Sequence, residues 1–430
     1  MRRTKTYLAV SAVALATVII PTTQAQVTGP SPRPSFPQSL LPLGKAPPEA
    51  GPNATTATEA PTGYDNLSNG FLSQGTFNSD RATFEEVETV ATGLGPTYNA
   101  QSCRECHQNV VTGHTSQIAE LRTGRMARGQ FFSSQGGSII QARSTWPDIV
   151  EQVGNSDNVR TLRITTSALG DGFVECIADA TLQAIASNQP SATRGTAIEV
   201  SVLEASSAAR VGRFGWKCQH ASLVSFSADA YLNEVGITSP LFPAENLADG
   251  MYVGSGTQYD PVPDPEDDGS DIAAFAAFMR STKAPARGPI TSDVTAGATV
   301  FANLGCAVCH VPSITTAPAG TVINGGAFTV PSALGNKVIH PYSDFLLHNV
   351  GTGDGIPIQT GAQFASTANQ MRTAPLWGLR TRNRLMHDGL SLTITDAITR
   401  HGGQAQQAAK AFNALNNKQE SQVLAFLNSL

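Results

Sequence analysis

The chain of 430 residues contains the sequence Cys-x-x-Cys-His twice. The cysteines and histidines of the two motifs are Cys103, Cys106, His107, Cys306, Cys309 and His310. Two thiols at this spacing can bond the two vinyl groups of one porphyrin, and the histidine that follows can bind the iron. The pattern therefore predicts two covalently bound haem c groups.

Other chemistry for these motifs is less consistent with their spacing. Four of the six cysteines and two of the eight histidines fall in the motifs, so chance is a poor explanation. The same residue types could hold zinc or form a thioredoxin-like dithiol. Paired zinc half-sites lie roughly 15–20 residues apart, whereas these motifs begin at residues 103 and 306. The spacing favours haem.

Residues 1–25 predict a signal peptide. Basic residues at 2, 3 and 5 precede an apolar run from Tyr7 to Ile20, and Ala25 is a suitable cleavage site. The run is shorter than the roughly 20 residues that span a bilayer, so we expect cleavage and no membrane span afterwards. Bacteria attach haem c outside the cytoplasm, and we therefore expect a soluble, periplasmic protein.

The amino-acid composition limits the classes of partner that the protein is expected to bind. Hydrophobic residues make up 40% and charged residues 14% of the chain, an ordinary globular balance. Cleavage would remove three basic residues and change the formal charge from −5 to −8. No basic stripe typical of nucleic-acid binding is present, so no nucleic-acid partner is expected.

The order of segments predicts two haem domains. Residues 26–62, rich in Pro and Thr, predict a disordered linker. A Pro/Gly stretch separates an N-terminal haem domain, residues 63–283, from a C-terminal cytochrome c domain, residues 284–430. The expected fold is mainly α: two c-type cytochrome domains, each around one covalent haem, with loops and a few short strands in the first. Helical spacing predicts helices at 83–90, 179–186, 221–235, 272–279, 296–304, 396–400 and 404–430.

The acidic run 260–268 precedes the predicted helix 272–279. Carboxylates there can cap a helix N-terminus and interact favourably with its dipole. The ligand spacing of an EF-hand is absent. We interpret the run as a helix cap and leave calcium open as a further cofactor.

Several longer stretches carry a resemblance to a known family. They are Leu94-Gly95-Pro96, Gly172-Phe173-Val174-Glu175-Cys176-Ile177, Gly212-Arg213-Phe214-Gly215-Trp216-Lys217, Gly236-Ile237-Thr238-Ser239-Pro240-Leu241-Phe242-Pro243, Leu347-His348-Asn349-Val350-Gly351, Arg372-Thr373-Ala374-Pro375-Leu376-Trp377-Gly378-Leu379 and Met386-His387-Asp388-Gly389. From about residue 70 onwards the chain resembles the dihaem oxidoreductases once called thiol-oxidoreductase-like proteins. These are relatives of the bacterial dihaem cytochrome c peroxidases.

The resemblance implies a division of labour between the haems. His107 and His310 are expected to be the proximal ligands. In the related peroxidases a Met-His-Asp-Gly stretch supplies the sixth ligand of the second haem, which implies Met386, and a thioether ligand raises the reduction potential. The first haem is then the reaction centre. His114 and His220 are the alternatives that could close its iron.

Other histidines and the tryptophans have supporting roles in this scheme. His348, His387 and His401 are expected to brace the second haem pocket by hydrogen bonds rather than to bind metal. Trp216 and Trp377 could carry electrons between the haems or serve as core aromatics.

A peroxidatic haem needs an acid–base group near the iron. The resemblance implies Glu175 as this catalytic group. Its apolar neighbours Phe173, Val174 and Ile177 are expected to raise its pKa. A solvated helix face is the alternative for Glu175, and Glu234 is the other candidate.

Cys176 and Cys218 remain outside the motifs. Members of the resembling family usually carry small residues at both positions. Two such departures in an exported protein imply that the two cysteines form a disulfide.

Together these observations predict a periplasmic dihaem c-type cytochrome with peroxidase-like oxidoreductase activity. Its partners would be a small oxidant such as hydrogen peroxide, reduced at the N-terminal haem, and a redox donor protein that feeds the C-terminal haem. A non-enzymatic electron-transfer cytochrome is the alternative, and a dihaem oxidase of an organic or protein substrate is a variant of the same chemistry.

Overall fold

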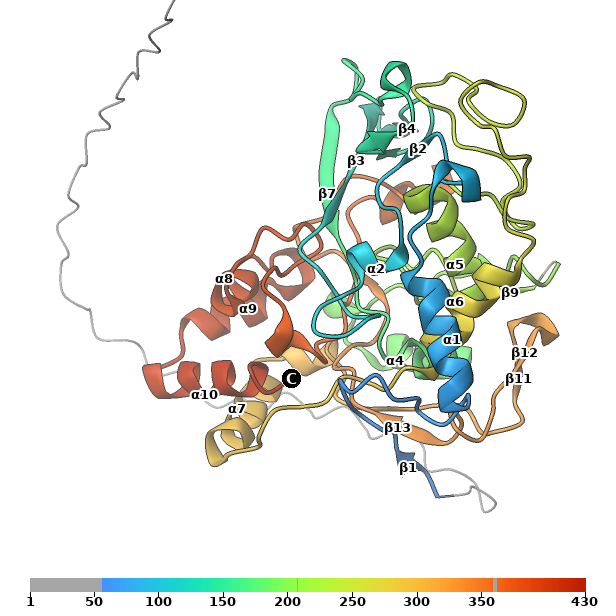
Figure 1. The fold of residues 1–430 in the computed structure, drawn as a ribbon. Helices are drawn as coiled ribbons and strands as arrows, with labels where there is room; N and C mark the ends of the chain where they lie inside the picture. Colours follow the sequence, from blue (N-terminus) through green and yellow to red (C-terminus); the bar gives the residue numbers. More distant parts are fainter. Residues whose placement is uncertain (1–55, 207, 359–361) are drawn as a thin grey trace, which may run out of the picture. The chain divides into compact units, whose positions relative to one another are not determined.

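The computed structural model describes residues 56–206, 208–358 and 362–430 (Figure 1). The predicted signal peptide and most of the predicted linker lie outside these residues. The α-helices are α1 (Gln74–Glu85), α2 (Cys103–Cys106), α3 (Asp171–Glu175), α4 (Asp179–Asn188), α5 (Leu223–Ala230), α6 (Ser270–Ser281), α7 (Ser292–Asn303), α8 (Ile394–Thr399), α9 (Gln406–Asn413) and α10 (Asn417–Leu427).

Strands contribute more than the sequence predicts. They are β1 (Thr58–Glu59), β2 (Thr97–Tyr98), β3 (Ala119–Ala127), β4 (Gln130–Ser133), β5 (Ile139–Ile140), β6 (Arg143–Ser144), β7 (Val159–Ile164), β8 (Glu199–Ser201), β9 (Ala209–Val211), β10 (Ile314–Thr315), β11 (Val322–Ile323), β12 (Phe328–Thr329), β13 (Lys337–Ile339), β14 (Leu347–His348) and β15 (Met371–Arg372). Of the described residues, 32% are helical and 17% extended, so the fold is mixed rather than mainly α.

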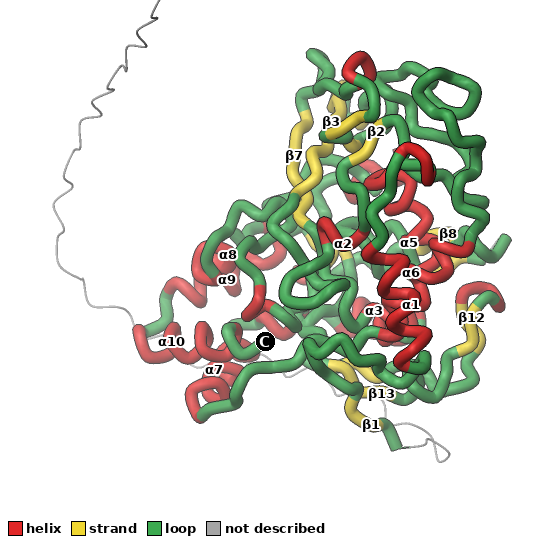
Figure 2. Tube along the Cα trace, viewed as in Figure 1, coloured by secondary structure: helices red, strands yellow, loops and turns green. Residues whose placement is uncertain are grey.

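The largest sheet lies between the first motif and α3. β3 pairs antiparallel with β4 and β5 along one edge and with β7 along the other (Figure 2). The nine residues of β3 exceed the short strands expected here. Their burial shows no strict alternation of buried and exposed residues, which explains why the sequence pattern did not reveal the length of the strand.

The first hydrophobic core surrounds α6. The helices α1, α3 and α5 all contact α6, and Phe84 of α1 packs against Phe275 and Phe278 of α6. The same core contains Leu334 and Phe345. Residues on both sides of the predicted boundary at residue 283 therefore build this core, and the division into two domains stays a prediction.

Helix ends follow local capping more than apolar spacing. Ser73 begins α1 by accepting a hydrogen bond from the Thr76 amide at 3.2 Å. The helix ends at Glu85, so the helix predicted at 83–90 is largely wrong: Val87 is exposed, whereas Glu88 is buried and bonded to Tyr231. Helices predicted at 179–186, 272–279 and 296–304 are confirmed as α4, α6 and α7.

The second core lies around α7 and α10. The two helices form the most extensive helix pair of the described chain, and Phe301 of α7 packs against Phe426 of α10. Gly297 permits their close approach, because a Cβ atom there would lie 1.9 Å from the Gln422 carbonyl oxygen. Leu385 and Ile398 pack against this core.

Long-range contacts join the early and late parts of the described chain. β1 pairs in parallel with β13, so residues assigned to the linker are part of a sheet. Asp354 forms buried ion pairs with Arg163 at 2.7 Å and Lys217 at 2.8 Å. Among the described residues, no helix has the length and apolar character to cross a membrane.

The Gly297→Ala substitution is expected to destabilise the haem-loaded protein by about 1–3 kcal/mol, because the added methyl group separates α7 from α10. Gly75→Ala in α1 is the matched control. Its Cβ would meet only the Ser73 hydroxyl, at 3.9 Å, so a change of at most about 1 kcal/mol, in the stabilising direction, is expected. Urea denaturation measures both, and equal effects would contradict the packing role of Gly297.

Candidate haem sites

The first motif presents a histidine that is oriented by a backbone carbonyl. Ser102 caps α2, and His107 follows directly after the helix. Nδ1 of His107 lies 2.9 Å from the carbonyl oxygen of His114. A carbonyl only accepts, so Nδ1 donates the hydrogen bond and Nε2 keeps its lone pair for a metal. Burial lowers the pKa of His107, which favours the neutral, ligating form.

The second motif repeats this arrangement. Gly305, at φ 85°, turns the chain into a short 3₁₀ helix that carries the cysteines. Nδ1 of His310 donates to the carbonyl oxygen of Tyr342 at 2.9 Å. Burial, and then the neighbouring His401, lower the pKa of His310 to about 4. Both motifs therefore fit a haem iron held by a neutral imidazole.

His114 and His220 are both engaged with protein groups. Nδ1 and Nε2 of His114 lie 2.8 Å and 2.7 Å from the hydroxyls of Ser167 and Thr381. The backbone carbonyl of His114 also accepts the hydrogen bond from Nδ1 of His107. Nε2 of His220 lies 3.2 Å from Asp229. In the described structure neither ring is placed opposite His107.

At the second motif the neighbouring ring belongs to His401. The centroids of the His310 and His401 rings lie 6.4 Å apart, with a tilt of 57°. Nδ1 of His401 donates to the Ala397 carbonyl at 2.7 Å, which again leaves Nε2 to bind. The half-buried Met386 has a left-handed backbone, with φ 65°. The sequence prediction placed His401 only in a bracing role.

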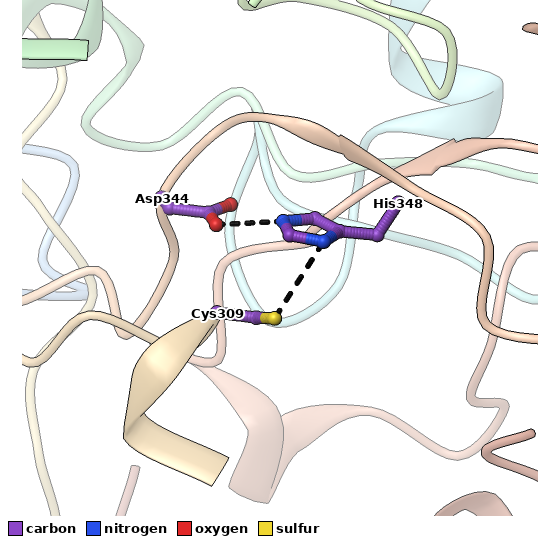
Figure 3. Close-up of side chains that lie close together, drawn as sticks. All are labelled: Cys309, Asp344 and His348. Carbon is purple, nitrogen blue, oxygen red and sulfur yellow. Dashed lines mark hydrogen bonds and ion pairs between the residues drawn. The ribbon is translucent and has the colours of Figure 1, made fainter. Parts of the chain in front are cut away.

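A cysteine, a histidine and an aspartate meet beside the second motif (Figure 3). His348 lies 3.7 Å from the Cys309 sulfur through Nδ1 and 2.8 Å from Asp344 through Nε2. Such a grouping could activate a nucleophilic thiol. However, burial raises the pKa of Cys309 far above its usual value, which is the opposite of an activated cysteine. The Asp344 carboxylate instead fixes the orientation of the His348 ring beside Cys309.

Glu175 lies in a different environment from the one predicted. It is fully buried, and its carboxylate accepts hydrogen bonds from Arg280 at 2.6 Å and 2.9 Å, from Asn324 at 2.9 Å and from the Leu223 amide at 2.9 Å. Burial alone would raise the pKa of Glu175, but the Arg280 guanidinium lowers it below its usual value. The prediction of a raised pKa for Glu175 is therefore wrong. Its partner Arg280 belongs to α6, which is distant in the sequence, so the neighbours of Glu175 along the chain did not reveal it.

A half-buried carboxylate pair, Glu120 and Glu234, lies beside the first motif. Asn99 donates to Glu234 at 2.8 Å, and Arg122 pairs with Glu120 at 2.5 Å. Burial and the charge of Glu120 raise the pKa of Glu234 well above its usual value, whereas Arg122 outweighs burial and lowers that of Glu120. The pair therefore favours the protonated form of Glu234 and the charged form of Glu120. Burial, Glu234 and other carboxylates raise the pKa of Cys106 to about 12, so the pair lies near the attachment thiol.

The two remaining cysteines are not joined. Cys176 and Cys218 are both buried and free, and the Cys218 thiol donates to the Phe345 carbonyl at 3.3 Å. The predicted disulfide is therefore not formed in this structure.

Trp216 and Trp377 have different surroundings. Trp377 is a member of the first core, whereas the ring centroid of Trp216 lies 6.2 Å from that of His387.

The chain belongs to the family described as "Di-haem oxidoreductase, putative peroxidase", which matches residues 142–430. The match includes the second motif and begins after the first. It confirms the family predicted from the sequence, and it implies an oxidoreductase with two haem groups. No curated protein matches the chain.

Three solved structures illustrate how distant the known relatives are. Hydrazine synthase of Kuenenia stuttgartiensis is 12% identical, with a TM-score of 0.40 over 93% of this chain and 100% of that chain. A MauG-like protein associated with microbial copper homeostasis is 13% identical, with a TM-score of 0.38 over 89% and 95%. The diheme peroxidase BthA from Burkholderia thailandensis is 13% identical, with a TM-score of 0.40 over 87% and 95%. At these TM-scores the likenesses carry no argument about the site.

The Glu175→Gln substitution is expected to destabilise the protein by about 3 kcal/mol or more, because it leaves the buried Arg280 charge without a partner. Glu59→Gln is the matched control, since Glu59 pairs with His340 at the surface and should change stability by less than about 0.5 kcal/mol. Guanidinium denaturation followed by circular dichroism measures both. An unchanged midpoint for Glu175→Gln would show that Glu175 has no structural role.

Proposed function

We propose that the protein is a periplasmic, peroxidase-type oxidoreductase with two covalently attached haems. The observation that carries this proposal is the difference between the two motifs. Glu234, whose pKa is raised, lies near the first motif, and among the described residues no second histidine ring packs beside His107, whose ring neighbour is Phe84. At the second motif a histidine ring lies beside His310. One site therefore suits a substrate and the other suits electron transfer.

Bound haem would supply an iron that binds a peroxide and exchanges electrons with it. The residues of the chain would handle the protons. Reduction of hydrogen peroxide to two waters consumes two electrons and two protons. The charge of Arg122 favours the ionised form of Glu120, and the neighbouring carboxylate favours the protonated form of Glu234, so the pair could take a proton from a bound peroxide and return one as the O–O bond breaks. We therefore assign the acid–base role to Glu234, in place of Glu175.

A set of contacts links the first motif to the Met386–Gly389 stretch of the C-terminal part. Thr165 bonds the Cys106 side chain. Its neighbour Ile164 accepts a hydrogen bond from the Trp216 indole at 2.7 Å and donates one to the His387 carbonyl at 2.7 Å. The path therefore leads from the first attachment cysteine to the Met386–Gly389 stretch. We propose that electrons from a donor protein enter at the second haem and follow this route.

We propose His401 as the sixth ligand of the second haem, rather than Met386. Two imidazoles that bind one metal from opposite sides, each at about 2 Å, have ring centroids about 6 Å apart. The separation of 6.4 Å between His310 and His401 agrees with this arrangement. Met386 is supported only by the resemblance of its Met-His-Asp-Gly stretch. Two histidine ligands would also give a lower potential than histidine with methionine.

Low-temperature electron paramagnetic resonance and visible spectra, before and after one equivalent of hydrogen peroxide, test the function. A high-spin, five-coordinate haem signal that disappears with peroxide is expected. Two low-spin signals that peroxide leaves unchanged in both the oxidised and the half-reduced protein would favour the alternative, an electron carrier without catalysis.

The Glu234→Gln substitution is expected to slow peroxide reduction by about 100-fold, because the amide cannot exchange the proton. Glu105→Gln is the matched control, since Glu105 also acts on Cys106 but pairs with Arg143 at the surface. Stopped-flow spectroscopy of the fully loaded variants measures the rate. A rate equal to that of the parent protein would exclude Glu234 as the acid–base group.

The His401→Met substitution is expected to raise the potential of the second haem and to introduce the long-wavelength absorption band of a methionine-bound ferric haem. Met386→Leu should leave the spectrum and potential unchanged. Redox titration with visible and near-infrared detection distinguishes the two residues. The opposite pattern, with that band present in the parent and lost in Met386→Leu, would restore Met386 as the ligand.

A further inference from the structure

A long loop connects the turn after α5 to α6 (Figure 1). Four carboxylates of this loop lie close together. They belong to Glu245, Asp260, Asp264 and Glu266, and one oxygen from each lies within 4.8 Å of the others. None of them is part of either haem motif. They have no role in the haem chemistry proposed above, so the cluster needs a separate explanation.

The cluster has one buried member, Asp260, and three half-buried ones, and it lacks compensating charge. Asp260 is only 7% exposed, and its Oδ2 atom has no hydrogen-bond partner. Oε1 of Glu245 and Oε1 of Glu266 are buried without partners as well. Within the described ranges, no lysine or arginine forms an ion pair with any of the four. Buried acceptors without donors are costly, and they indicate a missing cation.

The remaining oxygens are held in place by the loop itself. The amide and hydroxyl of Thr238 donate to Oε2 of Glu266, and the Val262 amide donates to Oδ1 of Asp260 at 3.2 Å. These bonds fix one oxygen of Glu266 and one of Asp260 and leave Oε1 of Glu266 and Oδ2 of Asp260 without a donor, whereas both oxygens of Asp264 accept long hydrogen bonds of 3.4 Å. Burial and the neighbouring acids raise the pKa of Glu245 to about 9, which reflects the repulsion within the cluster.

We propose that Glu245, Asp260, Asp264 and Glu266 form a structural binding site for one calcium ion. The donors are all hard carboxylate oxygens, and the loop that carries them is irregular, which suits the flexible coordination of Ca²⁺. Zinc and copper prefer nitrogen or sulfur donors, which are absent from the cluster. Mg²⁺ requires a stricter octahedron and retains its water.

The ion would stabilise the N-terminus of α6. Directly after Glu266, Asp267 accepts hydrogen bonds from the Asp271 and Ile272 amides at 3.1 Å and 3.3 Å. Farther along α6 lie the phenylalanines that pack on Phe84, which contacts the His107 ring. Calcium binding would therefore fix the start of the helix that supports the first haem pocket.

Isothermal titration with CaCl₂ tests the proposal on the haem-loaded chain after dialysis against a chelator. We expect one equivalent of Ca²⁺ to bind, a higher thermal midpoint in its presence, and at least tenfold weaker binding of Mg²⁺. Absence of both heat and thermal shift at millimolar CaCl₂ would overturn the proposal. This result does not depend on peroxidase activity, so the two proposals fail independently.

Asp264→Asn, compared with Asp268→Asn on the same loop, separates a calcium site from a merely structural cluster. Asp268 is exposed and outside the cluster. Asp264→Asn should weaken Ca²⁺ binding at least tenfold, yet raise the thermal midpoint of the calcium-free protein by relieving repulsion. Asp268→Asn should bind Ca²⁺ like the parent. Unchanged Ca²⁺ affinity in Asp264→Asn, or a lower midpoint without calcium, would contradict the proposal.

Discussion

The structure depends on one hydrogen bond that occurs twice: a motif histidine donates through Nδ1 to a backbone carbonyl. For His107 the acceptor belongs to His114, and for His310 it belongs to Tyr342. Each bond fixes the tautomer and the direction of the imidazole before any metal is bound. The surrounding structure serves to hold these two carbonyls in place. The His114 ring is bonded at both nitrogens, and Tyr342 packs against Phe301 and Phe426.

Apart from this shared hydrogen bond, the two sites have different surroundings. Near Cys106, Arg122 and Arg163 lower the pKa of Glu120, whereas burial and the charge of Glu120 raise the pKa of Glu234. Near Cys309, the histidine and aspartate form a compensated pair, and a second imidazole lies by the ligand. The same attachment motif thus acquires different chemistry from its neighbours, as is general for sites built on related folds.

The sequence was informative where function depends on residues close together along the chain. The two motifs, their histidines, the family and helices such as α6 could all be predicted, because spacing alone defines them. Glu175 was misjudged, since its local neighbours are apolar whereas its partner Arg280 lies 105 residues away. Glu120 with Glu234, and His310 with His401, were missed for the same reason. The length of β3 was underestimated because its residues do not alternate between buried and exposed.

The parallel pairing of β1 with β13 has a consequence for the order in which the chain can assemble. Residues 58 and 59 find their partners only after residues 337 and 338 have been made. The first core likewise cannot be completed until Leu334 and Phe345 have been synthesised. The first motif is therefore synthesised well before the partners that complete the fold around it. Contacts of such long sequence separation form slowly. The thiols of Cys103 and Cys106, half-buried in the finished protein, would thus stay accessible to solvent during that interval.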